Sequence, residues 1–247
     1  IQDLVDMENI ETITVEKDGT RSVIPADLAD FADFIATEPK ATIVAGSTDV
    51  GLWVTKQMRA LDPVVFINHL TELQAITDDD RGITIGAGVT YTQAFDVLAL
   101  ELPPLGRLID RIGGGQVRNM GTIGGNIANG SPIGDMPPPL IALGAKLTLR
   151  SRTGTRTIPL EDYFLAYGKQ DRMAGEFVET IFVPLPAEGA HFAVYKISKR
   201  RDEDISALCG AFYLELDAEG RVETIRVAFG GMAATPKRAR HVEEALL

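Results

Sequence analysis

Residues 113–139 read GGGQVRNMGTIGGNIANGSPIGDMPPP, the most unusual stretch of this chain. The stretch holds eight of the 24 glycines and four of the 13 prolines. Because both residue types weaken helices and strands, neither structure is expected to persist in it. A structureless segment of this length inside a compact domain is usually functional, and an omega-like surface loop is the plainer alternative.

The centre of this stretch, Gly121-Thr122-Ile123-Gly124-Gly125-Asn126, combines a hydroxyl, paired glycines and an amide side chain. A loop of similar chemistry, Ala45-Gly46-Ser47-Thr48-Asp49-Val50-Gly51, comes first in the chain and directly follows a short apolar segment. Successive N–H groups in such turns bind anions. This first loop matches neither a P-loop nor G-x-G-x-x-G, so by itself it also fits an ordinary turn. Together, two donor-rich loops favour a ligand with two phosphates and a long polar arm, such as a dinucleotide.

Strand and helix patterns follow one another irregularly along the chain, which predicts an α+β fold rather than a doubly wound sheet. Thr90 and Gln93 have the spacing of a capping box at a helix start. Thr235-Pro236 predicts another start, with proline in the first helical position. We expect strands at 12–16 (half-buried, with a turn at 17–19), 42–45, 64–67, 83–89, 146–150, 177–183, 192–198, 209–217 and 222–229, and helices at 25–39, 90–100, 105–112 and 236–247.

Pro184 and Pro186 mark the predicted domain boundary. The first domain is expected over 1–186, with subdomains of about 1–75 and 76–186, and the second over 187–247. The chain does not begin with Met and stops within an expected helix. Both ends are therefore interpreted as cuts through a longer polypeptide.

The composition excludes several classes of function. A formal net charge of −11 argues against nucleic-acid partners and anionic membrane surfaces, so a phosphorylated ligand would be held by backbone N–H groups. Cys209 is the single cysteine and the three histidines are far apart, so no disulfide, iron–sulfur cluster or other metal centre is expected. No signal peptide opens the chain and no apolar run could span a bilayer, which predicts no membrane partner and a cytoplasmic location.

The ordered motifs resemble the FAD-binding domain of the xanthine dehydrogenases, which are molybdenum hydroxylases with a flavin domain of the vanillyl-alcohol-oxidase type. These motifs are Gly46–Gly51, Gly115–Ile127, Ser131–Asp135, Phe192–Lys196, Arg200–Ile205, Ala228–Gly231 and Pro236–Ala239. The resemblance covers essentially the whole chain. It implies a two-subdomain FAD-binding domain followed by the truncated first part of a small C-terminal α+β flavoprotein domain.

The resemblance also implies roles for individual residues. Asp135 would bond the ribityl or ribose hydroxyls, and Lys196 would stabilise the negative charge at N1 and O2 of reduced flavin. Val178 would contact the ring, while Ile112 stands where relatives often carry an aromatic residue beside the adenine. Taken alone, Asp135 also fits a local Asx-turn and Lys196 an exposed strand lysine. The pyrophosphate and its flanking sugar would be held by Ile43, Val44, Ala45, Gly46, Ser47, Thr48, Asp49, Val50, Thr122, Ile123, Gly124, Gly125 and Asn126.

Three further residues match family positions near flavin N5 and NAD, namely Asp49, Tyr167 and Glu203. Glu203 belongs to the charged segment 199–204, which matches a loop beside the flavin ring. We expect it to tune the potential at the flavin and the admission of NAD. By itself, such a run of charges also fits a solvated turn.

The implied reaction is an electron relay. A purine is oxidised at a molybdenum centre elsewhere, electrons pass through iron–sulfur clusters to FAD, and reduced FAD gives hydride to NAD⁺. This chain holds neither the clusters nor molybdopterin, so both are expected in partner domains or subunits. Two alternatives remain: the FAD subunit of a carbon monoxide dehydrogenase or other molybdenum hydroxylase with an acceptor other than NAD, and a non-redox nucleotide-binding module.

Overall fold

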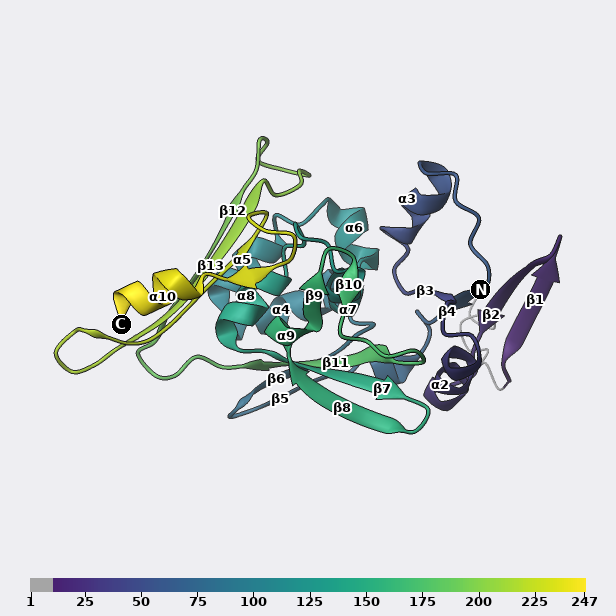
Figure 1. The fold of residues 1–247 in the computed structure, drawn as a ribbon, viewed down its shortest axis with the longest axis horizontal. Helices are drawn as coiled ribbons and strands as arrows, with labels where there is room; N and C mark the ends of the chain where they lie inside the picture. Colours follow the sequence, from purple (N-terminus) through teal and green to yellow (C-terminus); the bar gives the residue numbers. More distant parts are fainter. Residues whose placement is uncertain (1–10) are drawn as a thin grey trace.

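The computed structural model describes residues 11–247 and arranges them as separate sheets with helices between and around them (Figure 1). This mixture of segregated helices and sheets confirms the α+β class. Residues 1–10, where the first subdomain was predicted to begin, lie outside the described residues.

The first sheet has the strand order β1-β2-β4-β3 and is covered by helix α2. The β1–β2 hairpin is antiparallel, whereas β4 pairs in parallel with β2 and β3. The prediction of a half-buried first strand is wrong: β1 is exposed along its length because it is the outer edge strand (Figure 1). The elements are β1 Ile13–Lys17, β2 Thr20–Ile24, α2 Leu28–Thr37, β3 Thr42–Val44, α3 Val50–Thr55 and β4 Val64–Phe66.

The second sheet is antiparallel throughout, with the order β5-β6-β11-β7-β8. The strand predicted over 83–89 ends at Gly86, because the N–H of Gly88 donates to the carbonyl of Leu73 instead of continuing the ladder (2.8 Å). The elements of this region are η1 Thr71–Leu73, β5 Ile76–Asp79, β6 Gly82–Gly86, β7 Lys146–Ser151, β8 Gly154–Pro159, α9 Leu160–Tyr163, β9 Phe164–Ala166, β10 Lys169–Gln170 and β11 Phe177–Pro184.

The glycine- and proline-rich stretch 113–139 is not structureless, so that prediction and its omega-loop alternative are both wrong. Its glycines and prolines stand mainly at helix ends, where they favour helices instead of breaking them. Pro137 begins one helix, and Gly130 and Gly144 end two helices in the left-handed conformation. The helices from 90 to 144 are α4 Tyr91–Glu101, α5 Pro103–Ile109, α6 Gly115–Met120, α7 Ile123–Asn129 and α8 Pro137–Leu143.

The C-terminal sheet is an antiparallel meander in the order β12-β13-β14-β15. The helix predicted over 236–247 begins later than expected, after Ala239. Lys237 and Arg238 pair with β14 instead, so Pro236 does not stand in the first helical turn. The elements are β12 His191–Ile197, β13 Leu208–Leu216, β14 Val222–Gly230, β15 Lys237–Arg238 and α10 Arg240–Leu246.

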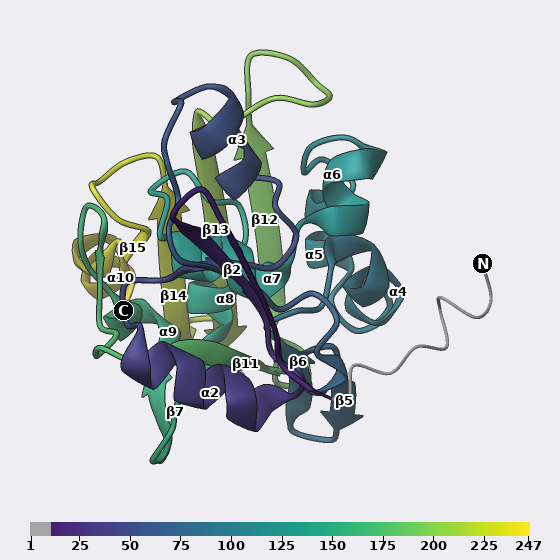
Figure 2. The same cartoon turned by 90° about the vertical axis from the view of Figure 1, so that its right-hand side faces the viewer.

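Two buried clusters organise these layers. The larger is formed by residues of the second sheet, the helices α4, α5, α7 and α8 and the C-terminal sheet, and Figure 2 shows how these elements are arranged. The smaller lies under α2, where the ring of Phe31 meets that of Phe177 on β11 with 4.3 Å between centroids. The first sheet is thereby attached to the second along one side. Within residues 11–247, no helix is both long enough and apolar enough to cross a membrane.

Candidate functional site

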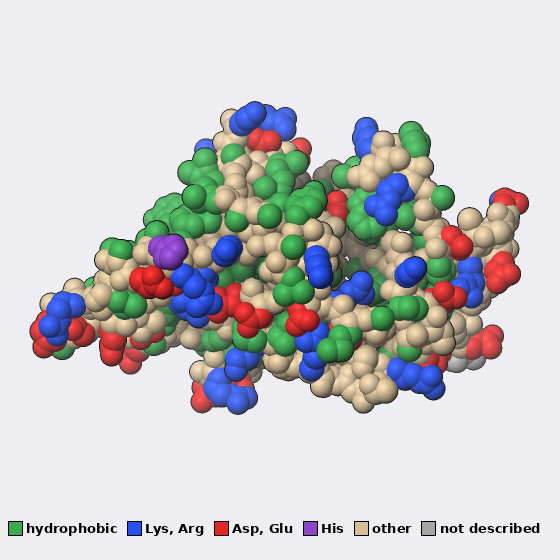
Figure 3. Space-filling view, in the orientation of Figure 1, with side chains coloured by type: hydrophobic (Ala, Val, Ile, Leu, Met, Phe, Trp, Pro, Cys, Tyr) green, Lys and Arg blue, Asp and Glu red, His purple; other side chains and the backbone are tan. Residues whose placement is uncertain are grey.

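A cavity of about 770 Å³ lies between the first sheet and the rest of the molecule. The space-filling view shows the molecule hollowed beside the part built on α3 (Figure 3). The loop after β3, helix α7, the start of β11 and the β12–β13 connection all contribute to its wall. Segments far apart in the sequence therefore converge on one ligand-sized space.

The loop after β3 forms the first wall. Ser47 adopts a left-handed φ of 59°, which turns the chain from the strand into α3. Within the described residues, no acceptor pairs with the N–H groups of Gly46, Ser47, Thr48 and Asp49. Successive N–H groups left open in such a turn are suited to an anion.

Gly46 brings this loop against the second glycine loop. A Cβ at Gly46 would lie 1.6 Å from the carbonyl oxygen of Met120 and 3.1 Å from the nitrogen of Gly121. Only glycine permits this approach of the two backbones. The two loops predicted to cooperate in binding therefore lie side by side.

The second wall is the start of α7. The hydroxyl of Thr122 accepts from the N–H of Gly125 at 3.0 Å and caps the helix. Gly124 packs against the backbone of Ala87, where an added Cβ would come within 2.5 Å. The side-chain oxygen of Asn126 accepts from the N–H of Met136 at 3.3 Å and so fixes the chain next to Asp135.

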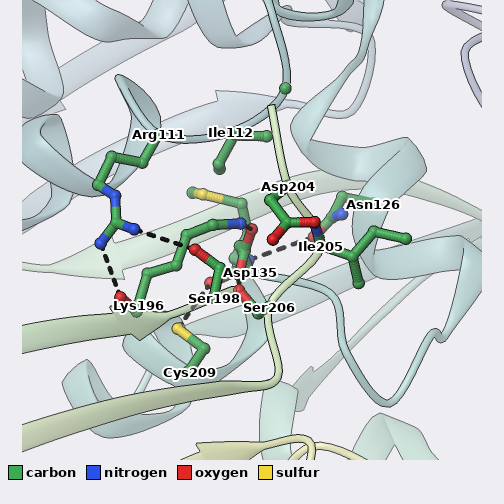
Figure 4. A network of polar contacts seen from close by, with 12 residues as sticks. Arg111, Ile112, Asn126, Asp135, Lys196, Ser198, Asp204, Ile205, Ser206 and Cys209 are labelled. Carbon is green, nitrogen blue, oxygen red and sulfur yellow. Dashed lines mark hydrogen bonds and ion pairs between the residues drawn. The ribbon is translucent and has the colours of Figure 1, made fainter. Parts of the chain in front are cut away.

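A buried ion pair stands at one side of the cavity. Lys196 Nζ lies 2.5 Å from Asp135 Oδ2, and both side chains are almost fully shielded from solvent. The hydroxyl of Ser206 donates to the other carboxylate oxygen, Oδ1 (Figure 4). Lys196 is therefore not the exposed strand lysine, and Asp135 does not form a local Asx-turn: its partners come from β12 and from the end of the β12–β13 connection.

The carboxylate of Asp135 affects the pKa of two neighbouring side chains, Cys209 and Tyr91. Burial and then the charge of Asp135 raise the pKa of the Cys209 thiol to about 12. Burial, with a further contribution from Asp135, also raises the pKa of the Tyr91 phenol. Both side chains are therefore neutral at physiological pH, and the ion pair supplies the fixed charges of this part of the wall.

The charged loop beyond β12 closes another side. Arg111 donates to the carbonyl of Lys196 at 2.6 Å and to the hydroxyl of Ser198 at 3.1 Å. Glu203 has a left-handed φ of 51°, and its carboxylate lies against Gly114. The loop therefore lies on the cavity wall and is more than a solvated turn.

Most of the residues predicted for the site line this one cavity: Ile43, Ala45, Gly46, Ser47, Thr48, Asp49, Val50, Thr122, Gly124, Gly125, Asn126, Asp135, Val178, Lys196 and Glu203. Four others do not. Val44, Ile112 and Ile123 are buried in the core, and Tyr167 is 75% exposed on the surface. For Ile112, the apolar spacing that it shares with Leu105, Leu108 and Ile109 already indicates a core position, although α5 ends at Ile109.

Several residues of the wall were not predicted from the sequence. Trp53 lies in α3 with the guanidinium of Arg59 4.5 Å from its ring centre, and both residues face the cavity. Arg172, Tyr91 and Ser206 also line it. Trp53 is the single tryptophan and follows the first loop closely, a signal that was available in the sequence. Arg172 and Ser206 give no local signal. No three His, Cys, Asp or Glu side chains group as metal ligands in the described part of the chain.

Two family models match the chain. The model of the FAD binding domain in molybdopterin dehydrogenase matches residues 11–186. The model of the CO dehydrogenase flavoprotein C-terminal domain matches residues 193–247. Together they span nearly all of the described residues.

Curated relatives agree with these matches. A putative xanthine dehydrogenase FAD-binding subunit of Escherichia coli K12 is 34% identical over 223 residues, covering 89% of this chain and 76% of the relative. The xanthine dehydrogenase/oxidase of Gallus gallus is 31% identical, covering 85% of this chain and 16% of that longer protein. The glyceraldehyde dehydrogenase medium chain of Sulfolobus acidocaldarius is 36% identical over 192 residues, covering 76% of this chain and 67% of the relative.

Among solved structures, the carbon monoxide dehydrogenase of Hydrogenophaga pseudoflava contains a chain that superposes with a TM-score of 0.84 at 28% identity. The match covers 91% of this chain and 78% of that one. The carbon monoxide dehydrogenase of Oligotropha carboxidovorans gives 0.83 at 27% identity, with 91% and 79% covered.

Proposed function

The chain belongs to the family of FAD-binding domains of molybdopterin dehydrogenases, and on this basis we propose that it is the FAD-carrying part of a xanthine dehydrogenase. In this proposal the chain would hold the FAD that accepts electrons, through iron–sulfur clusters, from a purine oxidised at a molybdenum centre, and that would supply hydride to NAD⁺. The clusters and molybdopterin would lie in partner domains or subunits, and the complex would act in the cytoplasm.

The convergence of both glycine loops and the Asp135–Lys196 pair on one cavity is the observation that supports this proposal. The residues present fit a dinucleotide cofactor. Open N–H groups of the first loop are suited to a diphosphate, which a chain of net charge −11 would otherwise repel. The absence of side chains at Gly46 and Gly124 keeps both backbones within reach.

We assign the cavity residues accordingly. The backbone N–H groups of 46–49 and the start of α7 would hold the pyrophosphate and its neighbouring sugar. Asp135 would accept from a ligand hydroxyl, while the Lys196 ammonium would stabilise negative charge on the bound ring. Val178 lines the cavity from β11 and would supply an apolar contact to the ring.

NAD would approach at the side of the cavity formed by Asp49 and Glu203. Both carboxylates line the wall, so they can influence a nicotinamide ring placed against the flavin. Tyr167, the third residue of this group, lies on the surface outside the cavity. The proposal for NAD therefore depends on Asp49 and Glu203.

A second candidate is the FAD subunit of an enzyme that oxidises carbon monoxide or an aldehyde and uses an acceptor other than NAD. The similarity to carbon monoxide dehydrogenase structures and to the glyceraldehyde dehydrogenase chain favours it. The same cavity serves both candidates, because they differ in the electron acceptor and not in the flavin.

Absorption spectroscopy tests the cofactor and the acceptor in turn. Purified chain supplied with FAD is expected to retain it and absorb at about 370 and 450 nm after gel filtration. Mixing the photoreduced chain with NAD⁺ without oxygen is expected to restore the band at about 450 nm, and Glu203→Gln is expected to change that rate. Reoxidation by a dye but not by NAD⁺ would favour the second candidate. A chain that retains no FAD would refute both.

A further inference from the structure

Ser206 is a buried polar residue for which the proposed function has no role. It stands just before β13 and is 4% exposed. Its hydroxyl donates to Oδ1 of Asp135, while Lys196 occupies Oδ2 (Figure 4). The two oxygens of one buried carboxylate thus accept hydrogen bonds from two different side chains.

The two separate donors stabilise the buried negative charge of Asp135. An ionised carboxylate accepts at both oxygens, and a buried oxygen without a donor is costly. Lys196 alone would leave Oδ1 without a partner. The Ser206 hydroxyl supplies that donor, so the carboxylate is held in the one rotation that faces the ammonium.

Ser206 also ends the charged loop between β12 and β13. At the other end, Arg111 fixes Ser198 and the carbonyl of Lys196. The N–H of Ala207 donates to the carbonyl of Ile197 at 2.8 Å and closes the base of the loop. The hydrogen bond from Ser206 therefore connects the loop that carries Glu203 to the buried ion pair.

We propose that Ser206 is a positioning residue that joins this loop to the Asp135–Lys196 pair. Its hydrogen bond would keep the loop and the two charges beside the flavin in one fixed arrangement relative to each other. The inference rests on the proposed FAD site. It predicts that Ser206 acts on FAD only through Asp135 and the loop, without being a ligand of the cofactor.

The test compares Ser206→Ala, which removes the donor, with Ser206→Thr, which keeps a hydroxyl. Cys209→Ala is the matched control: Cys209 is equally buried and next to the same residue, but its thiol points to the main-chain oxygen of Asp135 at 3.7 Å and not to the carboxylate. The control changes volume and leaves both carboxylate partners in place.

Three measurements are expected to distinguish Ser206→Ala from the parent. In the chain without FAD, amide hydrogen exchange in residues 199–205 is expected to accelerate on the order of tenfold, as the loss of one hydrogen bond to a charged group implies. In the FAD-loaded chain, affinity for FAD is expected to fall by a similar factor. The flavin potential is expected to become more negative, because the carboxylate loses the dipole that offsets its charge.

Ser206→Thr is expected to keep all three measurements near the parent values, and Cys209→Ala is expected to leave the potential unchanged. Equal exchange and equal potential in Ser206→Ala and the parent would overturn the inference, as would the same potential shift in Cys209→Ala. The exchange measurement needs no cofactor. It therefore decides the connection made by Ser206 even if the parent chain takes up no FAD, a result that would refute the proposed function instead.

Discussion

Among the lysines and arginines of residues 11–247, Lys196 alone is buried, so the loss of its charge is expected to be costly. Lys196→Met would leave the Asp135 carboxylate buried without its cation. We expect it to lower the free energy of unfolding by about 3–5 kcal/mol, measured by urea denaturation of the FAD-free chain. Asp135→Asn combined with Lys196→Met is expected to cost less than the sum of the two single changes.

Lys199→Met provides the comparison, because Lys199 lies three residues further on in the exposed loop. Its free energy of unfolding is expected to stay within about 0.5 kcal/mol of the parent. Equal free energies of unfolding in the two lysine variants would show that the ion pair does not stabilise the fold.

The motifs in the sequence predicted which residues belong to the site, but not which of them contact one another. The resemblance named Asp135 and Lys196 separately, but their contact spans 61 positions, and that of Ser206 with Asp135 spans 71. No local pattern encodes a pairing between residues so far apart. Their burial was equally hidden, since a lone lysine in a strand is usually exposed.

Among the elements, the contact between the two glycine loops determines the shape of the cavity. Gly46→Ala would drive a methyl group into the carbonyl of Met120. We expect a loss of about 1–3 kcal/mol in the free energy of unfolding, and weaker FAD binding, because the loops must separate. Urea denaturation and a fluorescence titration with FAD measure the two effects.

Gly51→Ala is the control in the adjoining helix α3, where an added Cβ meets nothing within 4 Å. Alanine favours a helix over glycine, so this variant is expected to gain up to about 1 kcal/mol and to bind FAD as the parent does. A loss of stability as large as that of Gly46→Ala would show that the loop contact is not the cause.

Helix ends show which elements could be predicted from the sequence and which could not. The capping box of Thr90 and Gln93 was correct because its two hydrogen bonds join residues three apart. The prediction for the stretch 113–139 is wrong because glycine and proline disrupt a helix in its interior and not at its ends. Pro137 at the start of α8 and Gly130 at the end of α7 are favourable in those places.

For the whole molecule, attachment of the C-terminal sheet is what brings Lys196 and Ser206 to the cavity. Arg226 of β14 donates to the carbonyls of Ile141 and Ala142 at the end of α8, the helix that follows Asp135. Arg238 joins β15 to Glu161 of α9 and to Glu243 of α10. The distant end of the sheet and the site are thus parts of one packed unit.

Glu243 makes this attachment sensitive to acid. Burial by itself raises the pKa of Glu243, but hydrogen bonds from Arg238 and from the N–H of Val227 outweigh it, and the pKa lies below the ordinary value of 4.5. Because the folded form binds the proton more weakly than the unfolded chain, the stabilisation is complete above about pH 4.5 and is lost as the pH falls through the lower folded value.

We therefore expect Glu243→Gln to reduce the free energy of unfolding by about 2 kcal/mol at neutral pH and to flatten its decline below about pH 4.5. Denaturation curves across that range measure both effects, and hydrogen exchange is expected to show β14 and β15 opening first. Glu244→Gln is the neighbouring control, because Glu244 is 70% exposed and its one ion-pair partner within residues 11–247 is the fully exposed His241. If Glu243→Gln kept the acid dependence of the parent, Glu243 would not be the residue that links protonation to the attachment of this sheet.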